Sequence, residues 1–193
     1  MSQHTFQTLT GKSPDELEQV LAAGSAPALS SIVGWEFRGW NVFGDVMAKA
    51  VGTVMGIQRF AKGFFVRGGA GVDVDGLPSI EGYNVKIQRG TRDDPWTGVP
   101  DDDHLTRHSF YKLYPRGTGE NRLGRYPNAL FLDYSLGVPA NNLFTGSTIK
   151  DFLVQVDADN PDLLLGKAFT KVGPVTNVGY FVLERLRKVD FQP

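Results

Sequence analysis

The chain contains no cysteine, and this excludes disulfide bonds, thiolate nucleophiles and cysteine-ligated zinc sites. It also lacks a surplus of positive charge, because 20 Lys and Arg residues face 21 Asp and Glu residues, for a formal net charge of -1. A nucleic-acid-binding surface needs Lys and Arg gathered in excess on one face. We therefore expect no nucleic-acid partner.

Long apolar runs are missing as well. No segment approaches the roughly 18 consecutive apolar residues of a transmembrane helix, and the first residues lack the basic and then apolar pattern of a secretory signal. We expect a cytoplasmic protein with no integral membrane contact. Hydrophobic residues make up 41% of the 193 residues and charged residues 21%, which is ordinary for one globular domain with a sizeable core.

A capped helix is predicted near the N-terminus, over residues 13–24. Ser13 suits the N-cap, Pro14 the first helical position, and Glu16 closes a capping box, while Gly24 ends the helix. The segment has a single apolar stripe, which suits docking against a larger body.

The chain divides into an extension and a main domain. We assign residues 1–30 to an N-terminal extension that carries the capped helix, and residues 31–193 to the main domain. Within that domain, residues 44–56 have a broad apolar face with few charges, which predicts a second helix.

The rest of the main domain consists of strand signals, rich in β-branched and aromatic residues and bounded by Gly, Pro, Asn or Asp. The segments are residues 33–44, 58–68, 79–90, 108–117, 128–137, 149–157, 162–173 and 177–188. Parallel strands would need helices between them, and the pattern has none. We predict a mainly β fold: a closed or nearly closed antiparallel β-barrel of about eight strands, with the N-terminal helix and a helical lid after the first strand. A β-sandwich is the alternative.

One pair of features resembles a known group of barrels. The first strand segment contains Gly34-Trp35 and the last contains Arg185. This resembles the calycin group, the lipocalins, fatty-acid-binding proteins and related small barrels, in which a tryptophan packs at the closed end beneath an arginine from the last strand. The helix after the first strand resembles the lid of fatty-acid-binding proteins, and the last strands resemble bacterial GXWXG-type domains. The resemblance covers the pattern of residues 31–188, although the motif here is Gly34-Trp35-x-x-x-Gly39 rather than Gly-x-Trp.

The predicted function is the binding or carriage of a small hydrophobic or amphipathic molecule in the barrel lumen. Such a site needs apolar walls and one or two polar groups that hold the ligand's head. The residues predicted to line it are Arg38, Trp40, Phe64, Tyr83, Val85, Phe110, Tyr111, Leu132, Tyr134 and Arg185. Alternation separates the two faces of a strand without identifying the inner one, so a slip of one residue reverses every assignment.

Two other functions remain open. The first is an enzyme, an isomerase or hydrolase of a hydrophobic substrate, with polar groups from residues 93–108 and Tyr111; histidines beside a carboxylate in the cavity would favour it. The second is an interaction protein with a filled barrel, in which Trp40 or Trp96 meets a partner or forms a homodimer.

The segment DDDHLTRH, residues 101–108, is the one metal-like pattern. His104 and His108 follow three aspartates. A four-residue spacing brings two imidazoles together only on a helix, whereas this segment has the pattern of a loop that enters a strand. We predict no metal site, and no cofactor, because phosphate-binding glycine motifs are absent. A nucleophile elbow is absent as well, so we assign no catalytic residue. The third histidine, His4, is expected in a frayed terminus.

Overall fold

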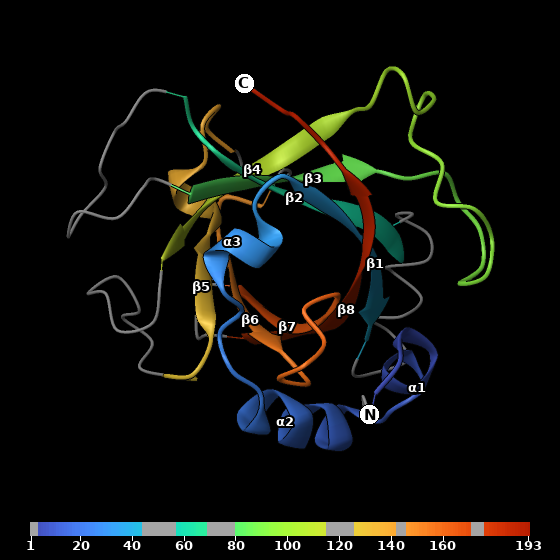
Figure 1. The fold of residues 1–193 in the computed structure, drawn as a ribbon, viewed down its shortest axis with the longest axis vertical. Coiled ribbons are helices and arrows are strands. Elements are labelled where there is room, and N and C mark those ends of the chain that lie inside the picture. Colours follow the sequence, from blue (N-terminus) through green and yellow to red (C-terminus); the bar gives the residue numbers. More distant parts are fainter. Residues whose placement is uncertain (1–3, 44–56, 69–79, 115–125, 142–145, 171–175) are drawn as a thin grey trace.

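Every segment with a strand signal forms a β-strand, and the strands run antiparallel around a closed barrel (Figure 1). The computed structural model describes residues 4–43, 57–68, 80–114, 126–141, 146–170 and 176–193. Its strands are β1 (Trp35–Val42), β2 (Arg59–Val66), β3 (Ile80–Lys86), β4 (Arg107–Tyr114), β5 (Leu130–Asp133), β6 (Ile149–Gln155), β7 (Leu163–Thr170) and β8 (Thr176–Lys188). Each strand pairs with the next, and β8 pairs with β1. The predicted closed antiparallel barrel is confirmed, and the sandwich is excluded.

The predicted N-terminal helix is also present, as α2 (Pro14–Ala23). The Ser13 hydroxyl accepts a hydrogen bond from the Glu16 backbone N–H, and the Glu16 carboxylate accepts one from the Ser13 N–H at 2.9 Å. Two shorter helices, α1 (Phe6–Thr10) and α3 (Leu29–Ile32), and a 3₁₀ turn, η2 (Tyr134–Leu136), were not predicted. The helical lid predicted over residues 44–56 lies outside the described residues.

Helices α1 and α2 pack on the outer face of the barrel (Figure 1). Their buried residues form one cluster with outward-facing strand residues; from the helices come Phe6, Leu9, Leu17 and Leu21. The expectation of a frayed terminus for His4 is wrong, because its Nδ1 lies 2.9 Å from Asp157 Oδ1. The division of the chain near residue 30 stays a prediction, and the extension shares its core with the barrel wall.

The inner face of the barrel is filled at one end. Phe37 is fully buried there, and the Arg185 guanidinium lies 4.2 Å from the centre of the Trp35 ring. The predicted stacking of Arg185 on Trp35 is thus present. Helix α3 lies across this end (Figure 1), with Ile32 in the inner cluster and the Ser31 carbonyl accepting a hydrogen bond from Arg185 Nη2 at 2.9 Å.

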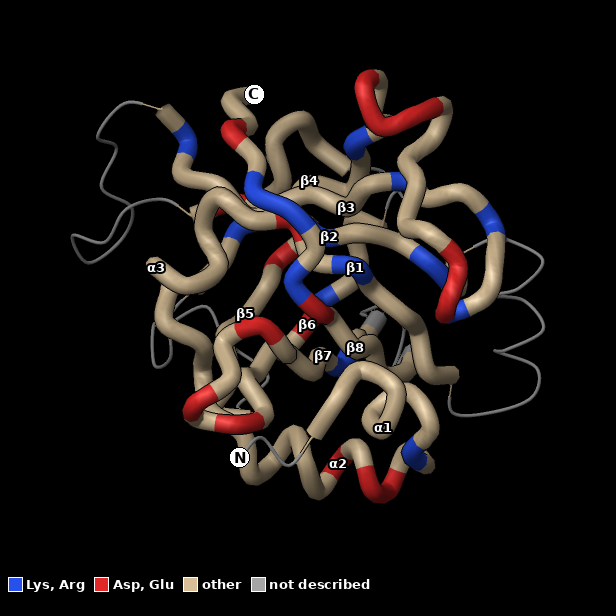
Figure 2. Tube along the Cα trace, turned by 45° about the vertical axis from the view of Figure 1, so that its right-hand side comes forward, with Lys and Arg blue, Asp and Glu red and all other residues tan. Residues whose placement is uncertain are grey.

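The described helices are all short. Among these residues, no helix is long and apolar enough to cross a membrane. In the view of Figure 2, basic and acidic positions are interspersed along the chain, in keeping with the balanced composition.

Candidate functional site

The other end of the barrel holds a cavity of about 580 Å³. Phe43 lies just beyond β1, Arg59 begins β2 and Ile149 begins β6, so the cavity lies at the end of these strands opposite Trp35. Its walls are largely apolar, with Phe60, Ile149, Ala168 and Phe181 among the lining residues. The cavity therefore lies above the packed closed end of the barrel.

One glycine makes room for the cavity wall. The ring of Phe181 lies against Gly166 on the neighbouring strand, where an added Cβ would come within 2.0 Å of the ring. A larger residue at this position would push Phe181 into the lumen, so Gly166 helps to keep the space open.

The floor of the cavity is a buried polar cluster. Lys62 comes from β2, Asp151 from β6 and Tyr134 directly follows β5, so the cluster joins opposite sides of the barrel. The exposed fractions of the three residues are 1%, 2% and 3%. Lys62 Nζ donates to Asp151 Oδ2 at 3.3 Å and to the Tyr134 hydroxyl, which itself donates to Asp151 Oδ2 at 2.9 Å.

The Lys62–Asp151 pair carries no net charge. Burial lowers the pKa of Lys62 and raises the pKa of Asp151, because each charged form loses hydration; their mutual attraction opposes both shifts. The aromatic rings around the ammonium add to its stabilisation, since Lys62 Nζ lies 4.4 Å from the Tyr111 ring centre and 5.2 Å from that of Phe181. The cluster is thus a neutral but strongly polar floor.

Asn84 and His108 lie beside this floor and also line the cavity. Asn84 pairs with Lys62 across β2 and β3 and with His108 across β3 and β4, so the three side chains share one face of the sheet. Burial, followed by the charges of Lys62 and Lys86, lowers the pKa of His108, which is therefore neutral near pH 7. Its Nδ1 lies 2.7 Å from the Ser109 hydroxyl.

Two oxygen atoms of the cavity lining lack a partner. Asp151 Oδ1 and Asn84 Oδ1 are both buried and have no hydrogen-bond partner within the described part of the chain. Buried polar atoms in folded proteins are nearly always paired, so such atoms in a cavity indicate where a ligand's donors would fit.

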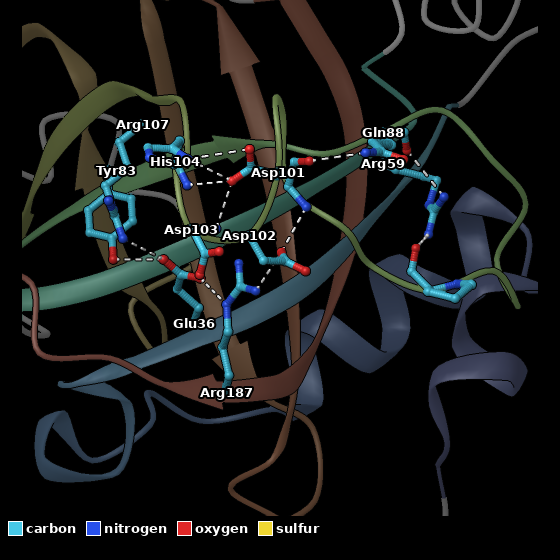
Figure 3. A network of polar contacts seen from close by, with 12 residues as sticks. Glu36, Arg59, Tyr83, Gln88, Asp101, Asp102, Asp103, His104, Arg107 and Arg187 are labelled. Atoms are coloured by element: carbon cyan, nitrogen blue, oxygen red, sulfur yellow. Dashed lines mark hydrogen bonds and ion pairs between the residues drawn. The ribbon is translucent and has the colours of Figure 1, made fainter.

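The aspartate-rich segment lies elsewhere, in the β3–β4 loop (residues 87–106), on the outer wall (Figure 3). His104 Nδ1 lies 3.0 Å from Asp101 Oδ1, and the His104 side chain is 78% exposed. His108 instead lines the cavity, so the two imidazoles do not converge, as the strand-entry pattern predicts. No group of three or more His, Asp or Glu residues among those described is arranged to hold a metal ion.

The same figure shows what holds this loop against the barrel (Figure 3). Glu36 is fully buried on the outer wall, where it accepts hydrogen bonds from Tyr83 at 2.9 Å and Arg187 at 2.7 Å and lies 3.6 Å from Arg107. Arg187 also donates to Asp102 of the loop at 2.9 Å. This network therefore has a structural role on the outer face of the barrel wall.

The predicted site residues fall into separate places. Tyr134 and Val85 line the cavity. Phe64, Tyr111 and Leu132 belong to the inner cluster but not to the cavity lining, and Arg185 lies at the closed end. Val85 belongs to the outer cluster with Tyr83 although it is among the lining residues, so its inward assignment is wrong. The other residues of this group lie on the inner side or at the closed end, and most of them fill the barrel rather than surround its open space. Their role in binding a ligand stays a prediction.

The remaining predicted residues point outward, and their assignment to the lumen needs correction. Tyr83 bonds Glu36, and Phe110 and Trp40 pack in the outer cluster. Arg38 forms an ion pair with Glu184 and lies 4.6 Å from the ring centre of Phe6 in α1. The reason is that the outer wall is itself covered, so apolar residues occur on both faces of these strands.

Trp96, which was predicted as a surface residue that could meet a partner, is buried instead. It is 7% exposed, its Nε1 donates to the Phe60 carbonyl at 3.2 Å, and the Arg59 guanidinium lies 4.1 Å from its ring centre. Trp96 therefore fastens the β3–β4 loop to the wall and offers little surface to a partner.

Sequence reasoning missed Lys62, Asp151 and Asn84. A signal was available, because Lys62 has the same strand parity as Phe60 and Phe64. A charge at an apolar position of an alternating strand is costly unless it is paired, and so it marks a buried polar site. Asp151 stands out in the same way in β6, where it has the same strand parity as the inner-cluster residues Ile149 and Leu153.

The closed eight-stranded antiparallel barrel agrees with the calycin resemblance at the level of architecture. No family model, curated protein or solved structure matches the chain, so the comparisons assign it to no family.

Proposed function

We propose that the protein binds a small amphipathic molecule in the barrel cavity. The observation that carries the proposal is an apolar-walled cavity of about 580 Å³ that ends on a buried polar floor. This volume falls within the roughly 300–1,000 Å³ of small-molecule sites. The apolar part of the ligand would contact Phe60 and Phe181, and its polar head would reach Asp151 and Asn84.

The first test asks whether the cavity holds a molecule at all. Native mass spectrometry of the freshly purified protein, followed by solvent extraction, should reveal a discrete extra mass that is released as an amphipathic compound. Binding of the neutral dye Nile red at one molecule per chain would support the same conclusion. A bare polypeptide mass together with no dye binding would contradict the proposal.

A matched pair of variants locates the binding site. Ala168 lines the cavity, so Ala168→Phe should fill it and weaken dye binding by at least about tenfold. Ala22 is exposed on α2, so Ala22→Phe adds the same ring outside the barrel and should leave binding unchanged. Equal loss in both variants, or in neither, would show that the dye binds elsewhere.

A specific observation favours a second function, an enzyme in the same cavity. His108, a neutral imidazole, lines the cavity together with the Asp151 carboxylate and the Tyr134 hydroxyl, a set that suits acid–base chemistry. The probe is hydrolysis of p-nitrophenyl octanoate. An enzyme would lose activity in His108→Gln and keep it in His104→Gln, whereas equal rates in both variants would exclude a hydrolytic role for His108.

A further inference from the structure

We propose that the head group recognised by the cavity floor is neutral and rich in hydrogen-bond donors, such as a primary amide or a hydroxyl, rather than a carboxylate or an amine. This inference rests on the proposed binding function and names the chemical class of its ligand. It depends on the charge balance of the floor and on its two unpartnered oxygen atoms.

The charge balance disfavours an ionic head group. The Lys62 ammonium is already paired with the Asp151 carboxylate at 3.3 Å, so the pair is neutral as a unit. A ligand carboxylate at the floor would lose its hydration and be repelled by the Asp151 carboxylate. A ligand ammonium would lose its hydration and be repelled by the Lys62 ammonium. Neither ion finds a free countercharge among the described residues of the floor, and burying an uncompensated ion is costly.

The unpartnered atoms favour donors. Asp151 Oδ1 and Asn84 Oδ1 are acceptors that line the cavity and have no partner in the described ranges of the chain. The Lys62 ammonium and the Tyr134 hydroxyl both donate to the other oxygen of Asp151, Oδ2, which leaves Oδ1 available. A hydroxyl supplies one donor and a primary amide supplies two, whereas a carboxylate supplies none.

The lining above the floor has a different character. Arg59 and Lys86 also line the cavity, and Lys86 is exposed. The Arg59 guanidinium donates to the carbonyls of Gln88, Asp94 and Pro95, and its Nε is unpartnered. In a rival arrangement, the ligand lies in the opposite orientation and its carboxylate binds Arg59 and Lys86, away from the floor. The experiment must distinguish this arrangement from binding of the head group at the floor.

The experiment is displacement of Nile red from the full chain by four probes of equal chain length at neutral pH: decanamide, decan-1-ol, decanoate and decylamine. The inference predicts that decanamide and decan-1-ol displace the dye at concentrations at least about tenfold lower than decanoate and decylamine do. It is overturned if either ionic probe displaces the dye as well as the neutral ones, or if no probe displaces it. Absence of dye binding would instead contradict the proposed function itself.

Two variants test the floor directly. Asp151→Asn leaves the Lys62 charge unpaired, so decanoate should gain at least about tenfold relative to decanamide. Asn84→Leu removes an unpartnered acceptor without changing the charge, so decanamide should weaken several-fold while decanoate stays constant. An unchanged probe ranking in a folded Asp151→Asn variant would overturn the proposal; should that variant fail to fold, Asn84→Leu decides, and unchanged decanamide affinity there overturns it.

The matched control is Tyr111→Phe. The Tyr111 hydroxyl donates to the Gly63 carbonyl at 3.1 Å, and Tyr111 does not line the cavity. Loss of this hydroxyl removes a buried polar group near the floor, so the variant controls for general loosening of the barrel. The probe ranking should stay as in the wild type. A shift equal to that of Asn84→Leu would mean that the ranking responds to general loosening of the barrel, and it would overturn the assignment of the head group to the Asn84 acceptor.

Discussion

The Lys62–Asp151 pair makes a strong prediction about stability. Replacement by Lys62→Met removes the cation but leaves a carboxyl that is 2% exposed and has lost its countercharge. At the Nζ–Oδ2 distance of 3.3 Å, the attraction amounts to about 5 kcal/mol for an effective dielectric constant of ~20. Breaking one side of a buried pair typically costs about 3–5 kcal/mol. We therefore expect Lys62→Met to lower the free energy of unfolding by about 3–5 kcal/mol at neutral pH.

The loss should depend on pH, with a defined sign. Burial raises the pKa of Asp151, and without Lys62 the attraction that opposes this shift is lost, so that only the hydrogen bond from Tyr134 still opposes it. The folded variant then binds a proton more tightly than the unfolded chain, so its stability falls as pH rises above the ordinary aspartate pKa, until the raised pKa of the folded state is passed. The deficit relative to the wild type should be smallest in mild acid and largest at neutral pH.

Urea unfolding followed by tryptophan fluorescence at a series of pH values measures both effects. The double variant Lys62→Met with Asp151→Leu is the control, because replacing both partners by apolar groups is often neutral or stabilising. It should recover most of the lost stability and show little pH dependence between mild acid and neutrality. A single variant that loses less than about 1 kcal/mol, the range of an exposed pair, with no change across pH, would refute the buried ion pair.

Three further predictions concern the closed end, the outer wall and the N-terminal helix. Arg185→Met removes the guanidinium that stacks on Trp35, and we expect a loss of about 1–2 kcal/mol in thermal unfolding; an unchanged melting temperature would contradict a role for this contact. Glu36→Gln leaves two arginines without their buried partner, so stability should fall by about 2 kcal/mol and proteolysis of the β3–β4 loop should accelerate; equal proteolysis rates would argue against the network as its anchor. Ser13→Ala removes the N-cap of α2 and should cost about 1 kcal/mol in urea unfolding, whereas Ser13→Gly should cost less; equal losses would mean that the hydroxyl contributes nothing.

The strands and the capped helix could be predicted because their signals are local. Ser13 and Glu16 satisfy backbone groups within one turn, and strand alternation in residues 79–90 needs no distant information. The barrel followed from the number and spacing of such segments and from the lack of helices between them. Helix α1, with five residues, is too short to carry a periodic signal.

The inner and outer faces could not be predicted, because both are buried. Tyr83 and Phe110 lie against Phe191, which follows β8, with the Tyr83 and Phe191 ring centres 4.6 Å apart. Both faces of these strands therefore bury apolar residues, and the usual contrast between a polar and an apolar face is lost. Charged residues at otherwise apolar strand positions would have identified the inner face better. Lys62 and Asp151 are tolerated there because each has the other as its partner across the lumen.

The closure of the barrel by β1 and β8 has a consequence for how the protein folds and is made. Trp40 pairs with Val182, so this seam joins residues from opposite ends of the chain. Until β8 is available, a sheet of the first seven strands has two free edges, and free edges invite pairing with other chains. Contacts of such large sequence separation also slow folding, because loop closure must come before the seam can form. The last strand is therefore both the final strand of the barrel to be synthesised and the one that covers the two free edges, β1 and β7, where pairing with other chains would begin.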